Sequence, residues 1–153
     1  MAGLKQIPST ALTADDATPQ EELGSLRYES NGKVYRYVAV RNLTANKGNA
    51  LAFTTSNNYY TSVSHPRNRL QCPAGVAIGT ITLSRYGWLQ CGGFGTYLHT
   101  SNRGTSAFPL ILMSGNNRLA TAWDSTSRVL PFARTLKTDS GSILNAFFFY
   151  GIV

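Results

Sequence analysis

Four residues in this chain could bind a soft metal ion or form a nucleophile with its base: His65, Cys72, Cys91 and His99. Zinc sites usually supply ligands in close pairs such as Cys-x2-Cys. Here six, eighteen and seven residues separate successive members. We expect Cys91 and His99 to lie on neighbouring strands of a hairpin, where they could approach each other. The wide spacing still favours buried thiols and hydrogen-bonded imidazoles, so we predict no metal ion and no cofactor.

Carboxylates are too scarce in most of the chain for ordinary acid–base catalysis. After residue 30 the only acidic residues are Asp124 and Asp139. A Cys–His pair would need one of them to orient the imidazole, and a glycosidase would need both. The stretch Gly92–Gly95 is rich in glycine but lacks the Lys-Ser/Thr ending of a phosphate-binding loop. We therefore predict that the protein is not an enzyme.

Charge is divided between an acidic leader and a basic body. Five of the seven acidic residues precede residue 30, and the remainder of the chain carries twelve basic residues against two acidic ones. The acidic residues of the leader are Asp15, Asp16, Glu21, Glu22 and Glu29. Segments of opposite sign attract each other, and nothing requires them to belong to the same copy. The pattern favours a protein that assembles with copies of itself or with a lattice.

The composition also favours a covered surface. Charged residues make up 14% of the chain, against roughly 25% in soluble domains. Arginine outnumbers lysine by ten to four, and arginine is favoured at interfaces because its planar fork is weakly hydrated. The basic residues of the body are dispersed, with Arg67 and Arg69 as the tightest pair, so we do not expect nucleic acid to be the partner.

No apolar stretch has the length of a membrane span, and the first 25 residues lack the apolar core of a secretory signal. We expect synthesis in a cytoplasm, no membrane partner and free thiols at both cysteines.

The body reads as all-β and as one domain, residues 26–153, in the form of a compact β-sandwich or a small β-barrel. Residues 33–40 alternate with strand period, so Arg36 falls in one row with Val34, Val38 and Val40. Asn31-Gly32 just before them is a strong hairpin signal. Thr61–Pro73 is polar and irregular, which predicts a long loop. The predicted strands are Leu26–Tyr28, Lys33–Val40, Ala50–Thr55, Val76–Leu83, Tyr86–Cys91, Phe94–Thr100, Pro109–Met113, Leu119–Trp123 and Ile143–Tyr150.

Residues 1–25 are predicted to form an extended N-terminal arm. This segment has no sustained hydrophobic periodicity, and Pro8 and Pro19 limit helix formation. We expect the arm to mediate attachment or subunit clasping and to contribute little to the core of its own body.

Two stretches of the chain carry a likeness to a known family. They are Leu23–Tyr28 continued by Asn31–Val38, and Tyr86–Gly93. Together they resemble tailed-phage capsid decoration (cement) proteins, in which an x-Gly-x-x-Tyr-Arg-Tyr strand opens the body and a Tyr-Gly-Trp strand lies near mid-chain. The structural motif residues are Tyr35, Arg36, Tyr37, Tyr86, Gly87 and Trp88.

The resemblance implies a β-rich structural protein without enzyme activity. It implies homotrimers on the outer head surface of the virion, bound to the major capsid protein with the N-terminal arm touching the shell. The basic segment His65–Arg69 departs from the family, whose mid-chain segment is often acidic or alanine-rich. The candidate contact residues are Asp15, Asp16, Glu21, Glu22, Arg67 and Arg69.

Two alternatives remain open from the sequence. One is a carbohydrate- or receptor-binding β module of a virion that uses Trp88, Trp123 or the tyrosines as a stacking platform. The other is a nucleic-acid-binding β-barrel, for which the basic body is the motive.

Overall fold

The computed structural model describes residues 9–41, 43–54, 59–62, 73–99, 109–112, 119–120, 133–137 and 143–148. In this part of the chain every regular element is a strand, which confirms the all-β prediction. The ten strands are β1 (Leu26–Tyr28), β2 (Val34–Arg41), β3 (Ala50–Phe53), β4 (Tyr60–Ser62), β5 (Pro73–Ala77), β6 (Tyr86–His99), β7 (Pro109–Leu112), β8 (Leu119–Ala120), β9 (Ala133–Lys137) and β10 (Ile143–Phe148).

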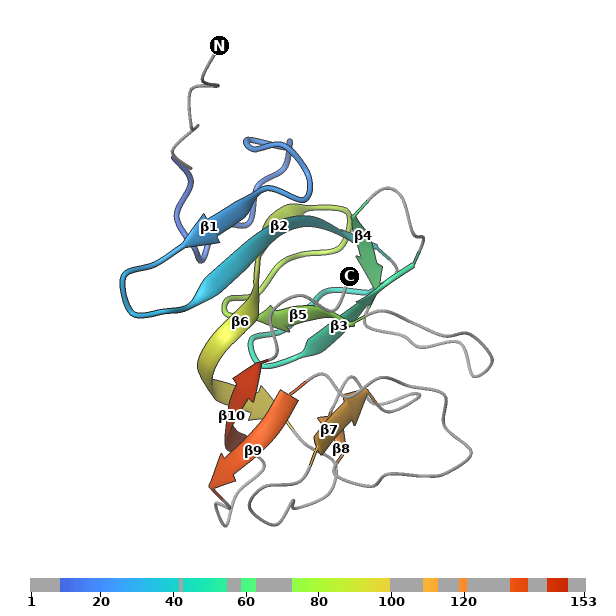
Figure 1. The fold of residues 1–153 in the computed structure, drawn as a ribbon. Coiled ribbons are helices and arrows are strands. Elements are labelled where there is room, and N and C mark those ends of the chain that lie inside the picture. The colour runs from blue at the N-terminus through green and yellow to red at the C-terminus, as the bar shows by residue number, and fades with distance from the viewer. Residues whose placement is uncertain are drawn as a thin grey trace.

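Five strands pair around a partially closed ring, which is consistent with the predicted compact all-β fold (Figure 1). β2 pairs parallel with β4, and β4, β3, β5 and β6 follow in antiparallel pairs. β6 then pairs antiparallel with β2, which returns the ring to its first strand. β1 lies beside the first half of β2 through a hairpin that contains the predicted Asn31-Gly32 turn.

β6 is one continuous strand of 14 residues where the sequence predicts two strands around a turn at Gly92-Gly93. Gly93 has the positive φ of 81° that a turn glycine would have, but here it bends the strand. The buried Gln90 side chain holds the bend, because its Nε2 donates to the carbonyls of Gly92 at 3.1 Å and Phe94 at 2.9 Å. The expectation that Cys91 and His99 face each other across a hairpin is therefore wrong. They lie eight residues apart on one strand, a path of roughly 25 Å.

The second half of β6 supports a further sheet outside the ring. β10 pairs with β6 from Gly93 to His99, and β9, β7 and β8 follow in order. Figure 1 shows this sheet below the barrel. The predicted C-terminal strand is confirmed over residues 143–148, and residues 149–153 lie outside the described part.

The remaining differences from the predicted strands are local. β5 begins at Pro73 and ends at Ala77, so only the first two residues of the predicted strand at 76–83 are extended in the sheet. β4 ends within the segment Thr61–Pro73 that is predicted to be a loop, and β9 is not among the predicted strands. β4 is three residues long and exists through parallel pairing with β2, a contact that leaves no periodic signal in the sequence.

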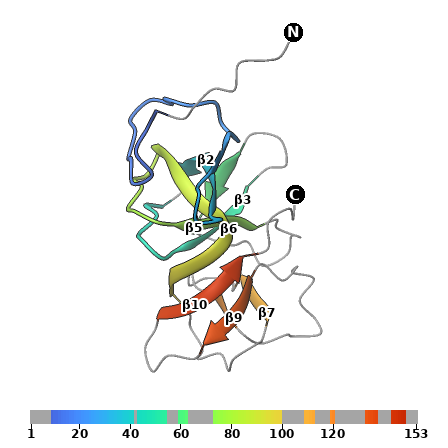
Figure 2. The same ribbon diagram turned by 60° about the vertical axis from the view of Figure 1, so that its left-hand side comes forward.

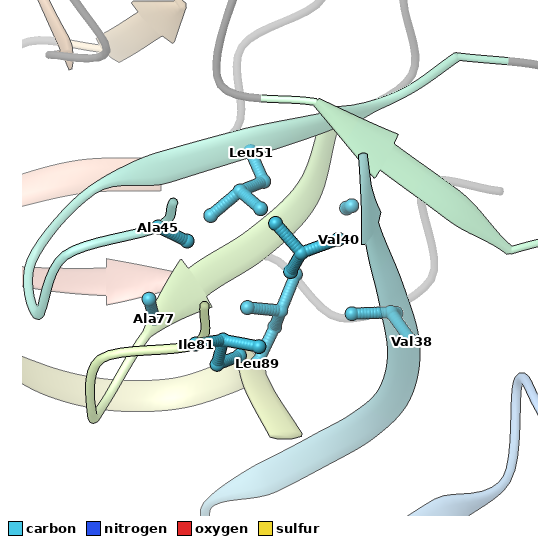
Figure 3. Packing of buried hydrophobic residues seen from close by; sticks show 8 residues of the cluster. Val38, Val40, Ala45, Leu51, Ala77, Ile81 and Leu89 are labelled. Carbon is cyan, nitrogen blue, oxygen red and sulfur yellow. The ribbon is translucent and has the colours of Figure 1, made fainter. Parts of the chain in front are cut away.

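The core has two parts because β2 is apolar on both faces. Residues 34–40 are all buried. One cluster fills the ring (Figure 3) and consists of Val38, Val40, Ala45, Leu51, Ala74, Ala77, Ile81 and Leu89. The other lies on the outer face of β2 and β6 and consists of Tyr35, Tyr37 and Trp88, with Leu12, Leu23, Ile78 and Tyr86 packed against it. Each buried face of β2 must pack against another part of the chain. The ring interior buries one face, and the N-terminal segment packs on the other.

Candidate functional site

Residues 9–25, named the strap here, lie across the outer aromatic face of the barrel (Figure 2). Leu12 and Leu23 pack against the cluster of Tyr35, Tyr37 and Trp88. The expectation that this segment contributes little to the body's own core is therefore wrong for residues 9–25. The physical reason is that two isolated leucines suffice when the aromatic surface is supplied by the strands.

The aromatic residues under the strap are held by their polar ends. Trp88 and Tyr37 meet edge to face, with ring centroids 5.1 Å apart, and both are completely buried. Trp88 Nε1 donates to Thr10 Oγ1 at 2.9 Å. The Tyr37 hydroxyl donates to Asp16 Oδ2 at 2.6 Å and accepts from the backbone N–H of Gln20 at 3.2 Å. Each ring thus meets an apolar surface and also satisfies its buried polar atom.

Three of the four acidic residues singled out for shell or subunit contact bind within their own chain. Asp15 accepts from the N–H and hydroxyl of Thr82 at 2.9 and 2.7 Å. Asp16 accepts from Tyr37. Glu21 is buried, and its Oε1 accepts from the N–H groups of Ser9 at 2.8 Å and of the next residue at 3.3 Å. Opposite charge plays a small part, since the exposed Asp15–Arg85 pair spans 3.4 Å and such pairs are weak.

Glu22, the fourth acidic residue, is exposed. Arg67 and Arg69 lie outside the described residues, as do His65, Cys72 and Trp123. The described part of the structure therefore leaves Glu22 as the charged candidate from the strap that faces solvent.

The Tyr-Gly-Trp motif is explained by the strap. Asp16 and Tyr86 form an antiparallel bridge in which each N–H donates to the other's carbonyl at 3.0 Å. A Cβ at Gly87 would lie 2.8 Å from the carbonyl oxygen of Ala14. Only glycine lets the strap backbone approach β6 this closely. The Tyr-Arg-Tyr motif serves the same face, since both of its tyrosines are buried there.

Trp88 is fully buried, so it is not available for stacking on a sugar. Tyr86, beside it, is partly covered by packing against the same cluster. The carbohydrate-binding alternative therefore loses Trp88, one of the residues on which it was based.

Cys91 is a buried thiol whose Sγ donates weakly to the Val34 carbonyl at 3.6 Å. Burial raises its pKa, and the nearby Arg36 guanidinium opposes that shift. A thiol in this state is a poor nucleophile. Within the described residues, no three His, Cys, Asp or Glu side chains lie close enough to hold a metal ion.

Sequence reasoning missed the strap residues that carry the contacts, chiefly Thr10, Leu12 and Leu23. One signal was present, because a tryptophan and two tyrosines on one face of paired strands need an apolar cover with acceptors for their polar atoms. The hydrophobic pattern of the leader itself gives no sign of these contacts, because its leucines are isolated.

Comparisons with protein-family models, with known proteins and with solved structures find no match to this chain. Over the residues that the structure describes, no helix is long and apolar enough to cross a membrane.

Replacing Tyr37 by Phe should lower the free energy of unfolding by about 1 to 2 kcal/mol at pH 7, because Asp16 and the Gln20 N–H each lose a partner. Burial, reinforced by the hydrogen bond to Asp16, raises the pKa of Tyr37 above its usual value of 10.0. The folded state therefore keeps the proton longer than the unfolded state does. The stability from this group is complete below pH 10 and declines as the pH rises further.

Urea unfolding at pH 7, 9 and 11 tests this, and the alkaline decline should be shallower in the Tyr37→Phe variant. Tyr35→Phe on the same face is the control, since no described residue bonds its hydroxyl and its loss at pH 7 should be smaller. Equal losses in the two variants at pH 7 would show that the Asp16 bond contributes nothing.

Proposed function

We propose that this protein is a structural virion protein that decorates and stabilises the icosahedral head of a tailed phage. It binds the major capsid protein lattice on the outer head surface, as a homotrimer, and catalyses no reaction. The proposal rests on the resemblance carried by residues 23–28 and 31–38 and by residues 86–93. What supports it is that these stretches are neighbours in space.

The two stretches form one structural unit. β2 pairs with β6 in a register that sets Tyr37 opposite Trp88. Leu23, Gly24 and Ser25 end the strap on the same face, where the Gly24 N–H donates to the Tyr37 carbonyl at 2.8 Å and the Tyr37 N–H to the Ser25 carbonyl at 3.0 Å. Short motifs that are separate in sequence but build one face are better evidence for a shared architecture than either motif alone.

A decoration role suits the physical character of the chain. Packaged DNA pushes outward on a thin shell, and a trimer that joins several coat subunits gains avidity from three weak contacts. Such a protein needs a rigid body and a large interface. The ring and the tied strap supply the rigid body, and the low charge fraction suits a surface that is covered in the assembly.

The contact surface now has to be sought beyond the acidic cluster, since Asp15, Asp16 and Glu21 already have partners. Exposed apolar residues offer an alternative at one end of the ring, where Leu43 is 49% and Leu83 45% exposed. They lie near each other, because the Leu83 N–H donates to the Thr44 hydroxyl at 3.2 Å. We propose this end as the shell-facing surface, and the contact roles of Glu22, Arg67 and Arg69 stay predictions from the sequence.

Heads assembled without this protein should release their DNA at a lower temperature than the same heads after the purified protein is added. Dye-detected DNA release on heating measures the difference, and heat-unfolded protein is the control. Identical release temperatures would refute the proposal.

Sedimentation of the free protein at tens of micromolar should give the mass of three chains, and a one-chain mass would refute the trimer.

A further inference from the structure

Arg36 is a buried cation without an anion in the described part of the structure. Its position in the strand places it on the ring side of β2, in the row of Val38 and Val40. The residue is 7% exposed, and its Nε has no hydrogen-bond partner. The ion pairs among the described residues join Arg27 to Glu29 and Arg85 to Asp15, and none includes Arg36.

Two aromatic rings flank the guanidinium. Its Cζ lies 5.6 Å from the ring centroid of Phe53 and 5.8 Å from that of Tyr59. The rings themselves meet edge to face at 5.9 Å. Cation–π contact offsets only part of the hydration free energy that a guanidinium loses on burial. Five N–H donors in a planar fork remain suited to a carboxylate, which they can hold with two parallel hydrogen bonds.

Tyr59 is the more exposed of the two aromatic neighbours of Arg36. It is 37% exposed, and its ring packs over Gly24, where a Cβ would lie 2.4 Å from the ring. Its backbone has a φ of 49°, a conformation that bulky L residues rarely adopt. Such strain is concentrated at ligand clamps and switch regions. One of the two rings beside Arg36 thus belongs to a partly exposed side chain on strained backbone.

We propose that Arg36 is the receptor for a carboxylate, supplied by an acidic side chain of the protein on which this chain docks. The buried fork, its aromatic walls and the excess of basic residues in the body all point to an anionic partner group. The identity of that partner as the coat lattice rests on the proposed function. The carboxylate site itself does not, and the two can be tested apart.

The site is tested first on the isolated protein by raising sodium acetate from zero to 200 mM, with sodium chloride keeping the ionic strength constant. We expect the melting temperature of the wild type to rise and saturate, and the Nε–Hε NMR resonance of Arg36 to shift with the same midpoint. Arg36→Met should lose the acetate response. In the absence of acetate it should melt at least as high as the wild type, because an unpaired buried charge has been replaced by an apolar side chain of similar length.

Arg41→Met is the matched control. Arg41 lies on the same strand and stacks on one aromatic ring, that of Tyr60 at 4.8 Å. This variant should keep the full acetate response. If the wild type shows no saturable response, or if Arg36→Met responds as the wild type does, the carboxylate site is refuted. The Arg36 resonance in the wild type decides the matter even if Arg36→Met fails to fold.

The second arm measures binding to heads that lack the protein. Arg36→Met should bind at least ten-fold more weakly than Arg41→Met. Equal binding by the two variants would refute the role of Arg36 in docking. A wild type that responds to acetate but does not bind heads would refute the decoration function and leave Arg36 as a carboxylate site with a different partner.

Discussion

Deleting residues 1–22 should abolish the cooperative folded state at 37 °C rather than leave an intact barrel. The deletion removes Leu12 from the cover of Tyr35, Tyr37 and Trp88 and removes the partners of Trp88 Nε1 and the Tyr37 hydroxyl. Fully burying one large apolar side chain contributes about 1.5 to 3 kcal/mol. Partly uncovering three of them, together with the lost hydrogen bonds, approaches the lower end of the 5 to 15 kcal/mol that stabilises a typical small protein.

Thermal unfolding followed by circular dichroism, together with binding of a dye for exposed apolar surface, measures this effect. The control is deletion of residues 1–8, which keeps all of the strap contacts described above and should melt within about 2 °C of the full chain. If the longer deletion melted like the full chain, the strap would be an accessory and not part of the core.

Trp88→Ala should destabilise the protein by about 3 to 5 kcal/mol, because it leaves a large cavity between β6 and the strap. Trp88→Phe keeps most of the ring and loses the bond to Thr10, so it should cost about 1 to 2 kcal/mol. Urea unfolding gives both values. Combining Trp88→Phe with Thr10→Val should cost less than the sum of the single changes, since both remove the same bond. A loss below 1 kcal/mol in Trp88→Ala would mean that this face is not a packed core.

The sequence was most informative where a segment's own pattern decides its structure. Residues 34–41 alternate with the period of a strand, which predicts β2. The Asn31-Gly32 pair predicts a hairpin turn before it, and therefore β1 as its neighbour. The barrel or sandwich class followed from short strands separated by turn residues. β4 was not predictable, because its three residues are held by pairing with β2 and β3, which leaves no pattern in its own sequence.

The predicted turn at Gly92-Gly93 was wrong because a glycine suits both a turn and a bent strand. A left-handed φ serves a hairpin turn and a strand bend equally well, so local sequence does not distinguish them. The choice is made by Gln90, whose amide bonds two carbonyls around the bend, and by β10, which pairs along the far half of the strand. Both partners act only in the folded chain.

Part of the Arg36 site could be predicted from the sequence. Strand alternation already placed Arg36 in the apolar row with Val38 and Val40, an unusual position for a cation. What could not be foreseen was that Phe53 and Tyr59 flank it. The strap was missed for a related reason, since several of its contacts are with residues about 70 positions away.

That separation has a consequence for the order of events during synthesis. Thr10 and Trp88 are 78 residues apart, and Asp15 and Thr82 are 67 apart. At a synthesis rate of roughly 5 to 20 residues per second, the strap waits on the order of ten seconds before its β6 partners emerge from the ribosome. During that interval the aromatic side of the β1–β2 hairpin is open to chaperones and to other nascent copies. The strap is thus made well before β6 but can take its final place only after it.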